Sequence, residues 1–312
     1  MFDNMAPPTR IFDELRALLP DSVVRQDEPL AKKTTLRVGG RADVCLEPVS
    51  EDDLARAIQF CRRENVPFLI LGRGSNLLVR DGGVRGLVIC LSHPNLSRIE
   101  ADGALLHCGA GARLKAVSTR ARELDLAGLE FLDGIPGSVG GALRMNAGAM
   151  GGAVLDVVTQ VRFMDPAGQV HERNIAQVPS EYRSCPFFQV NIALGATFRG
   201  QPGAKEAIAK KTVEFNQKRW SSQPREPSAG CIFKNPSRTL SAGKLIEELG
   251  LKGARRGGAV VSTVHGNFII NDRDATARDV LQLIEDIQTR ARTERGVELQ
   301  TEVQIIGEEA GA

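Results

Sequence analysis

The chain reads GIPGSVGG at residues 134–141 and NAG at residues 146–148, within a glycine-dense region that extends from residue 128 to 152. Glycine weakens a regular helix or strand, because its backbone loses more conformational freedom on folding than that of other residues. The absence of a side chain also lets the main chain turn tightly and lie against a ligand. The region therefore predicts short helical turns joined by loops that face a large, flat or phosphorylated cofactor. A glycine-rich packing crossover is the alternative.

A shorter glycine loop, GRGSN at residues 72–76, follows a predicted buried strand at 68–71. It lacks the dinucleotide-binding fingerprint, because Leu77 stands at the third glycine position and an apolar strand, rather than a helix, follows. A Rossmann unit is therefore not expected. Consecutive small residues can still turn several backbone N–H groups toward one anion, which predicts a phosphate-binding loop. An ordinary tight turn is the alternative.

The composition excludes several classes of protein. A chain of 312 residues exceeds the length at which one core usually stops growing, so we expect two or three packed units. Its 42% hydrophobic and 25% charged residues are typical of a globular protein. The 40 basic and 38 acidic residues give a net charge of +2, which is too balanced for a protein that coats nucleic acid. No apolar run reaches the ~20 residues of a membrane span and no signal segment is recognised, so we expect a cytoplasmic protein.

The cysteines and histidines do not indicate a metal site. The six cysteines lie far apart without a Cys-x-x-Cys pair, and we expect reduced thiols rather than disulfides. Only four histidines are present, and the sequence contains no Walker A loop, Gly-x-Ser-x-Gly elbow or His-Glu-x-x-His motif. We therefore expect no bound metal.

Local patterns predict helices and strands in a mixed order. Helices are expected at 9–19, from an N-cap at Ser50 to about residue 63, and at 113–124. A hairpin is expected to turn at Asp102-Gly103, and further strands are expected at 42–46, 86–91, 157–164, 169–173 and 191–198. Because helices and strands mix without strict alternation, the fold class is expected to be α+β.

A break in composition at residues 200–203 is the predicted domain boundary. Beyond it we expect helices at 204–220, 241–249 and 276–295, and strands at 231–233, near 260, near 268 and at 299–306. Residues 201–260 hold twelve Lys or Arg against five Asp or Glu, a surplus of +7. This surplus predicts attraction for a polyanionic small molecule such as a diphosphate, with a solvated helix face as the alternative.

Four side chains stand out, although each has an ordinary explanation when taken alone. Arg183, in the segment EYR, is typical of surface ion pairs, and Cys231, after a glycine turn, is typical of a buried apolar side chain. Glu302 lies in the predicted closing strand, where single carboxylates normally face solvent. His265, in VHGNF, fits a structural histidine.

Five segments, taken in order, resemble the UDP-N-acetylenolpyruvoylglucosamine reductase family. They are 72–78, 134–148, 182–183, 229–236 and 299–307, and the resemblance extends roughly from Thr34 to Gly307. It implies a flavoenzyme with FAD as cofactor and NADPH as reductant. The implied reaction reduces the enolpyruvyl group of UDP-N-acetylglucosamine enolpyruvate to give UDP-N-acetylmuramate, in the synthesis of the peptidoglycan precursor.

The resemblance also implies a domain organisation. An N-terminal helix and lead-in at 1–33 would precede an FAD-binding domain at 34–200, of the type found in p-cresol methylhydroxylase and vanillyl-alcohol oxidase. Its two α+β lobes would be 34–96 and 97–200, and a substrate-binding α+β domain would follow at 201–312. The chain lacks the insertion that the longer subclass carries between the Tyr-Arg and serine motifs, so it is similar to the shorter, second subclass. A monomer is expected.

Roles for individual residues follow from the resemblance alone. Arg183 matches the family's catalytic arginine and Glu302 its catalytic glutamate, whereas Cys231 stands where most members have a serine that donates a proton. The residues implied to bind FAD are Gly72, Arg73, Gly74, Ser75, Asn76, Leu77, Gly134, Ile135, Pro136, Gly137, Ser138, Gly140, Gly141, Asn146, Ala147 and Gly148. Those implied to bind the substrate are Tyr182, Lys218, Arg219, Gln223, Lys234, Asn235 and His265.

Two other functions stay open at the level of the sequence. A different FAD oxidoreductase, such as a sugar or alcohol oxidase, could use the same scaffold, although an oxidase needs no proton donor for an α-carbon. A nucleotide-sugar-binding protein that has lost its flavin could keep the basic segment. The colour of the purified protein distinguishes the binding protein from the enzymes.

Overall fold

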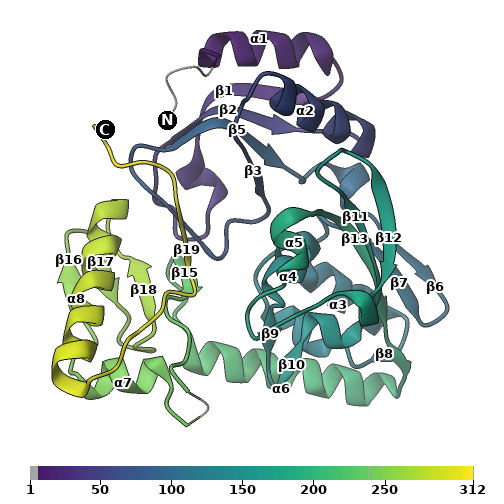
Figure 1. Cartoon of the computed structure of the whole chain (residues 1–312). Coiled ribbons are helices and arrows are strands. Elements are labelled where there is room, and N and C mark those ends of the chain that lie inside the picture. Colours follow the sequence, from purple (N-terminus) through teal and green to yellow (C-terminus); the bar gives the residue numbers. More distant parts are fainter. Residues whose placement is uncertain (1–5, 238, 312) are drawn as a thin grey trace. The chain divides into compact units, whose positions relative to one another are not determined.

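The computed structural model describes residues 6–237 and 239–311, which form two compact units (Figure 1). The first unit takes the described chain up to Gln26, then Val44–Arg73 and Gly86–Lys218. The second takes Asp27–Asp43, Gly74–Arg85 and the described chain from Arg219 onward. The contiguous domain boundaries expected from the sequence stay predictions.

Two N-terminal helices pack on a four-stranded sheet. Ile11 and Leu15 of α1 (Pro8–Leu18) share one apolar core with Leu54 and Ile58 of α2 (Glu51–Arg63). Ser50 Oγ accepts a hydrogen bond from the backbone N–H of Asp53 at 3.1 Å, which confirms the predicted N-cap of α2. The strands, in sheet order, are β1 (Val23–Pro29), β2 (Arg41–Glu47), β5 (Val84–Cys90) and β3 (Phe68–Leu71), with β3 parallel to β5.

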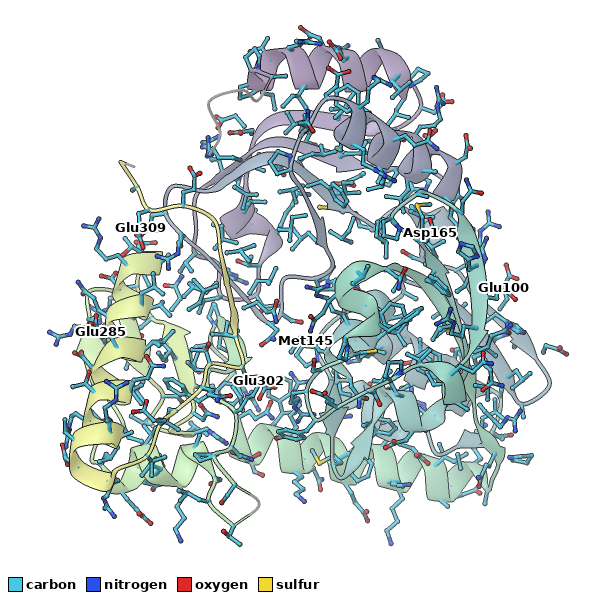
Figure 2. All side chains as sticks on the ribbon, in the orientation of Figure 1. Glu100, Met145, Asp165, Glu285, Glu302 and Glu309 are labelled. Atoms are coloured by element: carbon cyan, nitrogen blue, oxygen red, sulfur yellow. The ribbon has the colours of Figure 1, made fainter. Side chains whose placement is uncertain are left out.

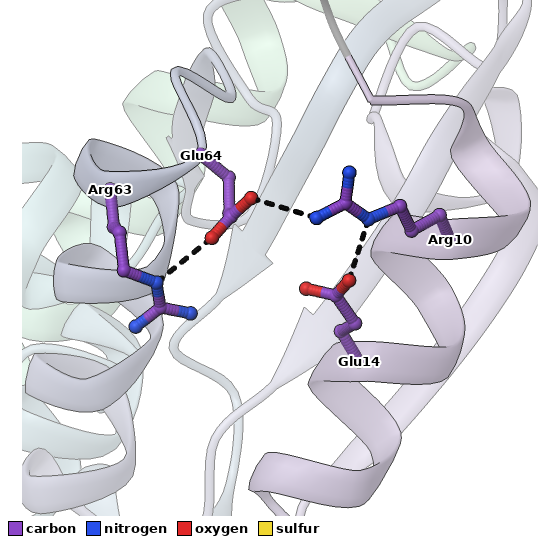
Figure 3. Close-up of polar contacts among 4 residues, drawn as sticks. All are labelled: Arg10, Glu14, Arg63 and Glu64. Atoms are coloured by element: carbon purple, nitrogen blue, oxygen red, sulfur yellow. Dashed lines mark hydrogen bonds and ion pairs between the residues drawn. The ribbon is translucent and has the colours of Figure 1, made fainter.

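A short chain of ion pairs joins α1 to the end of α2 (Figure 3). The Arg10 guanidinium donates to Glu14 at 2.6 Å and to Glu64 at 3.0 Å, and Glu64 also accepts from Arg63 at 2.8 Å. The hydrogen bond to Glu14 raises the pKa of Arg10. Because such exposed pairs are screened by water and salt, the shared apolar core is what holds α1 in place.

A second, antiparallel sheet forms the rest of the first unit. Its hairpin turns where the sequence predicts, because Asp102 pairs with Leu105 across Gly103. The strands, in sheet order, are β12 (Val170–Asn174), β11 (Val158–Met164), β13 (Ile192–Arg199), β7 (Leu105–Gly109) and β6 (Ile99–Asp102). The helices are α3 (Leu114–Glu123), α4 (Val139–Met145) and α5 (Phe187–Val190). Their apolar side chains form one buried core.

The glycine-dense region adopts short turns and loops, which confirms that part of the prediction, whereas the cofactor that the loops would face stays a prediction. A 3-10 turn at Glu130–Gly134 leads through a loop into the seven-residue α4. Asn146 then ends α4 in the left-handed conformation, at φ 40°, a common way to terminate a helix. The two-residue strands β9 (Gly148–Ala149) and β10 (Gly152–Ala153) form a small hairpin. After β13, β14 (Gln201–Pro202) pairs with β8 (Leu126–Ala127), and α6 extends over Lys205–Ser222.

The second unit has its own sheet and its own core (Figure 1). Val280, Leu283 and Ile287 of the long helix α8 (Ala277–Arg295) are buried in this core. The helix α7 (Ala242–Glu248) contributes Leu245 and Ile246. The antiparallel strands, in sheet order, are β15 (Ser228–Cys231), β18 (Phe268–Asn271), β17 (Ala259–Val261) and β16 (Arg255–Arg256). No helix within residues 6–237 and 239–311 is long and apolar enough to cross a membrane.

The closing strand is shorter than expected. β19 spans only Gln304–Ile306 and pairs in parallel with β4 (Leu77–Val79), so the strand predicted from residue 299 was wrong at its start. Before residue 304 the chain pairs with another partner, because Lys234 N–H donates to Gln300 O and Glu302 N–H donates to Ile232 O. Two successive partners divide the segment into an isolated bridge and a short strand.

The carboxylate of Asp81 secures the start of α8. It accepts from the backbone N–H groups of Ala277 at 2.8 Å and Arg278 at 3.0 Å, which have no partner within the helix. We predict that Asp81→Ala lowers the free energy of unfolding by about 1–2 kcal/mol, the usual effect of losing an N-terminal cap. Urea denaturation measures this, with Glu285→Ala on the exposed face of α8 as the control. Equal stability of the two variants would contradict the assigned role.

Candidate active site

Arg183 is held in a strained turn beside the glycine-dense region of the first unit. Its backbone has φ 56°, which is costly for a residue with a side chain, and Glu181 and Ser184 close the turn around it with two backbone hydrogen bonds. The guanidinium donates to Gly148 O at 3.2 Å and lies 5.1 Å from the centre of the Tyr182 ring. Strain of this kind persists only where the surrounding structure fixes it, and it is common at functional sites.

Gly148 has to be a glycine for Arg183 to lie where it does. A Cβ atom added to Gly148 would lie 2.8 Å from Arg183 Nη1 and 2.8 Å from Gly152 O. Asn146 joins the same turn, because its side-chain amide donates to Glu181 O at 3.4 Å and its oxygen accepts from Leu155 N–H at 3.3 Å. The structure thus brings together Arg183, Asn146 and Gly148, which the sequence analysis assigned to catalysis and to flavin binding.

The loop before α4 has open space beside its main chain at one position, as a cofactor cradle requires. Gly134 is buried, yet a Cβ atom added there meets no atom within 4 Å. A Cβ at Gly72 would lie 2.8 Å from Ser138 Oγ, and one at Gly141 meets only Ser138 Oγ, at 3.8 Å. Gly72 and the loop at 134–141 therefore meet at Ser138, and open space lies beside the backbone at Gly134. These residues fit a large planar or phosphorylated group.

Two arginines flank this cradle. Arg113 forms a backbone bridge with Ser138, and partial burial together with the positive charge of Arg113 lowers the pKa of Arg73. Within residues 6–237 and 239–311 neither guanidinium makes an ion pair or a side-chain hydrogen bond. The sequence analysis did not find Arg113. The available signal was the run GAGA at 109–112, which places a cation directly after four small residues.

In the second unit, backbone hydrogen bonds place the segments of Cys231 and Glu302 side by side. Glu302 N–H donates at 2.7 Å to the carbonyl of Ile232, the residue after Cys231, and Phe233 bridges to Thr301. Cys231 ends β15 opposite Phe268 and is half-buried, and Glu302 lies on the extended segment that follows α8 (Figure 2). The two predicted catalytic residues of this unit therefore lie on neighbouring segments.

Part of the predicted phosphate-binding loop lies at the same place. The side-chain amide of Asn76 donates to Glu302 O at 3.0 Å, and Asn76 O accepts from Gln304 N–H at 3.0 Å. A Cβ atom added to Gly230 would lie 3.9 Å from Ser75 O. The structure thus brings Ser75 and Asn76 together with Cys231 and Glu302. The convergence of Arg183 with Cys231 and Glu302 stays a prediction.

Two residues expected to bind substrate have structural contacts. Asn235 Oδ1 accepts from Ala242 N–H at 3.1 Å, which helps to begin α7. His265 Nδ1 accepts from Asn267 N–H at 3.1 Å, and its ring lies against Gly243. Burial lowers the pKa of His265, so the ring is neutral near pH 7. Both residues keep other polar atoms, and their role in binding stays a prediction.

The end of α6 carries a cationic and aromatic group. Arg219 lies 4.8 Å from the ring of Trp220, and Arg225 lies 5.8 Å from the same ring. Lys218 lies on the same helix, next to Arg219. Gln223 lies just after the helix, and its backbone N–H donates to Arg219 O. The sequence analysis included the neighbours of Trp220 but not Trp220 itself.

Five of the six thiols are buried and unsuited to chemistry. Burial raises the pKa of Cys61 and Cys108 to about 12, and it also raises the pKa of Cys185. Cys231 is the half-buried thiol among the six. In the described part of the chain, no group of three His, Cys, Asp or Glu side chains is arranged to hold a metal ion.

Known families cover both parts of the sequence. Residues 42–174 match the family described as an FAD binding domain, and residues 223–306 match the C-terminal domain of UDP-N-acetylenolpyruvoylglucosamine reductase. The reductase of Rhodopseudomonas palustris is 44% identical over 301 residues, which cover 96% of this chain and 97% of that protein. The chain belongs to the UDP-N-acetylenolpyruvoylglucosamine reductase family. The reductase of Syntrophus aciditrophicus, 42% identical over 305 residues, covers 96% of both chains.

A solved structure agrees with this assignment. The UDP-N-acetylenolpyruvylglucosamine reductase of Thermus caldophilus superimposes with a TM-score of 0.78 at 35% identity, over 92% of this chain and 99% of that chain. The α+β fold combines an FAD binding domain with a C-terminal reductase domain, as the resemblance implied. The protein is a flavin-dependent oxidoreductase that uses FAD and NADPH.

Proposed function

We propose that the chain reduces the enolpyruvyl group of UDP-N-acetylglucosamine enolpyruvate to give UDP-N-acetylmuramate, with NADPH as the reductant. FAD bound to the glycine loops would supply the hydride transfer from NADPH to the methylene carbon of the substrate. The observation that carries the assignment of residues is the hydrogen bond from Arg183 to Gly148 O, which fixes a guanidinium at the glycine-dense region. The reaction itself is supported by the similarity of the whole chain to the reductases named above.

Arg183 stabilises the charge that develops during the reaction. Hydride addition to the methylene carbon leaves negative charge on the neighbouring carbon, which delocalises into the substrate carboxylate. A guanidinium already fixed against those oxygens favours this state over the ground state, since it needs no reorganisation as the charge forms. Its planar group of donors matches a carboxylate better than an ammonium does. In its protonated form, Glu302 donates a further hydrogen bond to the same oxygens.

Cys231 completes the reaction by donating a proton to the α-carbon. An ordinary thiol has a pKa of ~8.5 and is mostly protonated near pH 7, and it is more acidic than a serine hydroxyl. Cys231 is half-buried at the end of β15, next to the segment that carries Glu302. This position suits a donor that acts after the hydride has been transferred.

The remaining predicted residues bind the two nucleotides. We assign FAD to the loops at 72–77, 134–141 and 146–148, and support for the second of these is the open space beside the main chain at Gly134. We assign the diphosphate and sugar of the substrate to Lys218, Arg219, Gln223, Lys234 and Asn235, and further substrate contacts to Tyr182 and His265. The surplus of +7 between residues 201 and 260 supports the diphosphate assignment. We also propose a cytoplasmic monomer without a nucleic-acid partner.

The colour of the protein tests this function. We expect a yellow protein that NADPH bleaches without oxygen, and whose colour returns when the enolpyruvyl sugar nucleotide is added, with one product formed per flavin reoxidised. The control omits the substrate and must stay bleached. Reoxidation by oxygen and not by the substrate would instead identify an oxidase, and a colourless protein that takes up no FAD would identify a binding protein.

A further inference from the structure

We propose that Arg113 binds the diphosphate of FAD together with Arg73, as a cofactor-binding residue outside the five segments that carry the resemblance. The proposal rests on the proposed placement of FAD against the loops at 72–77 and 134–141. It extends that placement to the start of α3, which none of those segments includes.

Backbone hydrogen bonds fix Arg113 at the cradle. Arg113 and Ser138 form an antiparallel bridge, Leu114 N–H donates to Gly137 O at 3.3 Å, and Val139 N–H donates to Ala112 O at 2.9 Å. Arg113 is therefore joined to the loop before α4 on both sides. Because a Cβ atom at Gly72 would lie 2.8 Å from Ser138 Oγ, the segment that carries Arg73 lies against the same serine.

The two guanidiniums form an unbalanced pair of positive charges. The charge of Arg113 contributes to the lowered pKa of Arg73, so the two groups repel each other. No carboxylate among residues 6–237 and 239–311 forms an ion pair with either of them, whereas Arg120, seven residues further on, pairs with Glu123 at 3.1 Å. Like charges that a fold holds together without a counterion favour the binding of an anion.

A diphosphate matches this arrangement in charge and in hydrogen bonding. Its two negative charges balance the two guanidiniums, and planar donors bind phosphate oxygens in pairs. The diphosphate of FAD is joined to a flat ring system, which needs open space beside the main chain such as that at Gly134. Before the cofactor binds, repulsion between the arginines opposes folding, and FAD removes that opposition.

The test compares Arg113→Gln with Lys115→Gln in the full-length protein. Both changes remove one positive charge near the start of α3, but Lys115 has no part in the bridge to Ser138. We expect Arg113→Gln to raise the dissociation constant of FAD about tenfold or more, since hydrogen bonds to charged groups are the strong ones. Its affinity should also depend less on salt. Flavin fluorescence quenching during titration of the FAD-free protein measures both quantities, and Lys115→Gln should match the wild type.

Thermal unfolding of the FAD-free proteins separates this role from a structural one. Arg113→Gln should unfold at the same temperature as the wild type or a higher one, because it removes repulsion. Inorganic pyrophosphate should raise the unfolding temperature of the wild type more than that of Arg113→Gln. A lowered unfolding temperature of the variant without ligand, or an equal response of both proteins to pyrophosphate, would overturn the proposal.

A third variant distinguishes failure of this inference from failure of the proposed FAD placement. Gly134→Ala adds a methyl group where the protein has open space, so it should weaken FAD binding without destabilising the FAD-free protein. If Gly134→Ala weakens binding and Arg113→Gln does not, the role of Arg113 is overturned and the placement stands. If both variants bind FAD like the wild type, the placement itself is wrong.

Discussion

Replacement of Arg183 by glutamine lowers kcat by about 10²–10³-fold, the usual effect of losing one preorganised donor at a developing charge. The side chain is fixed by Gly148 O at 3.2 Å and by the Tyr182 ring at 5.1 Å, so its placement does not have to be established during the reaction. Arg183→Lys recovers little of the loss, because one ammonium group cannot match both carboxylate oxygens.

The two half-reactions show which step needs Arg183. In stopped-flow absorbance measurements without oxygen, bleaching by NADPH should proceed as in the wild type, whereas reoxidation by the enolpyruvyl substrate should slow by the full factor. Arg173→Gln is the matched control, because Arg173 also lies over aromatic rings of the first unit, 5.5 Å from Phe163 and 4.9 Å from Phe187. Equal slowing of both half-reactions would assign Arg183 to flavin binding instead.

A glycine at position 183 separates catalysis from structure. The backbone there has φ 56°, a conformation that glycine adopts without strain. Arg183→Gly loses the stacking on Tyr182 but relieves the backbone strain. Its free energy of unfolding should therefore fall by no more than the loss of stacking predicts, and the variant should be as inactive as Arg183→Gln. Recovery of activity in the glycine variant would mean that the turn, rather than the guanidinium, is what the reaction needs.

The sequence predicts those parts of the fold whose signals are local. The N-cap of α2 depends on two residues three positions apart, Ser50 and Asp53, and the hairpin at Asp102-Gly103 depends on a single turn. Thr276 and Asp279 likewise cap α8 reciprocally. The division into two units could not be predicted in this way. It depends on β4 pairing with β19, and no local pattern in Leu77–Val79 specifies a partner near the end of the chain.

The candidate site likewise contains residues that the sequence indicates and residues that only the structure reveals. The resemblance indicates Arg183, Cys231 and Glu302 because each stands in one of the five segments that carry it. Arg113 is absent from that set, since its interest comes from a bridge to Ser138 and from its charge near Arg73, neither of which is local. The structural role of Asn235 could not be predicted for the same reason, because its contact with Ala242 N–H is visible only after α7 is placed.

Cys231→Ser should remain active, whereas Cys231→Ala should lose about 10²–10⁴-fold in substrate reduction, the range for a general acid. Serine provides an O–H in the place of the S–H, and alanine provides no transferable proton. The alanine variant should still be reduced by NADPH at the wild-type rate, because that step transfers no proton to the α-carbon. Stopped-flow reoxidation by the enolpyruvyl substrate measures the loss, and an alanine variant that turns over normally would place the proton donor elsewhere.

Alkylation provides an independent measure of the same thiol. The other five cysteines are buried, and the pKa of about 12 for Cys61 and Cys108 leaves almost no thiolate to react. Iodoacetamide should therefore inactivate the folded wild-type enzyme by modifying Cys231 first, and the substrate should slow this reaction. Cys231→Ser should be active and also resistant to iodoacetamide. An active and resistant Cys231→Ser, together with an inactive Cys231→Ala, would exclude a purely structural role. A thiol needed only for packing would not make both alkylation and the loss of a transferable proton stop substrate reduction.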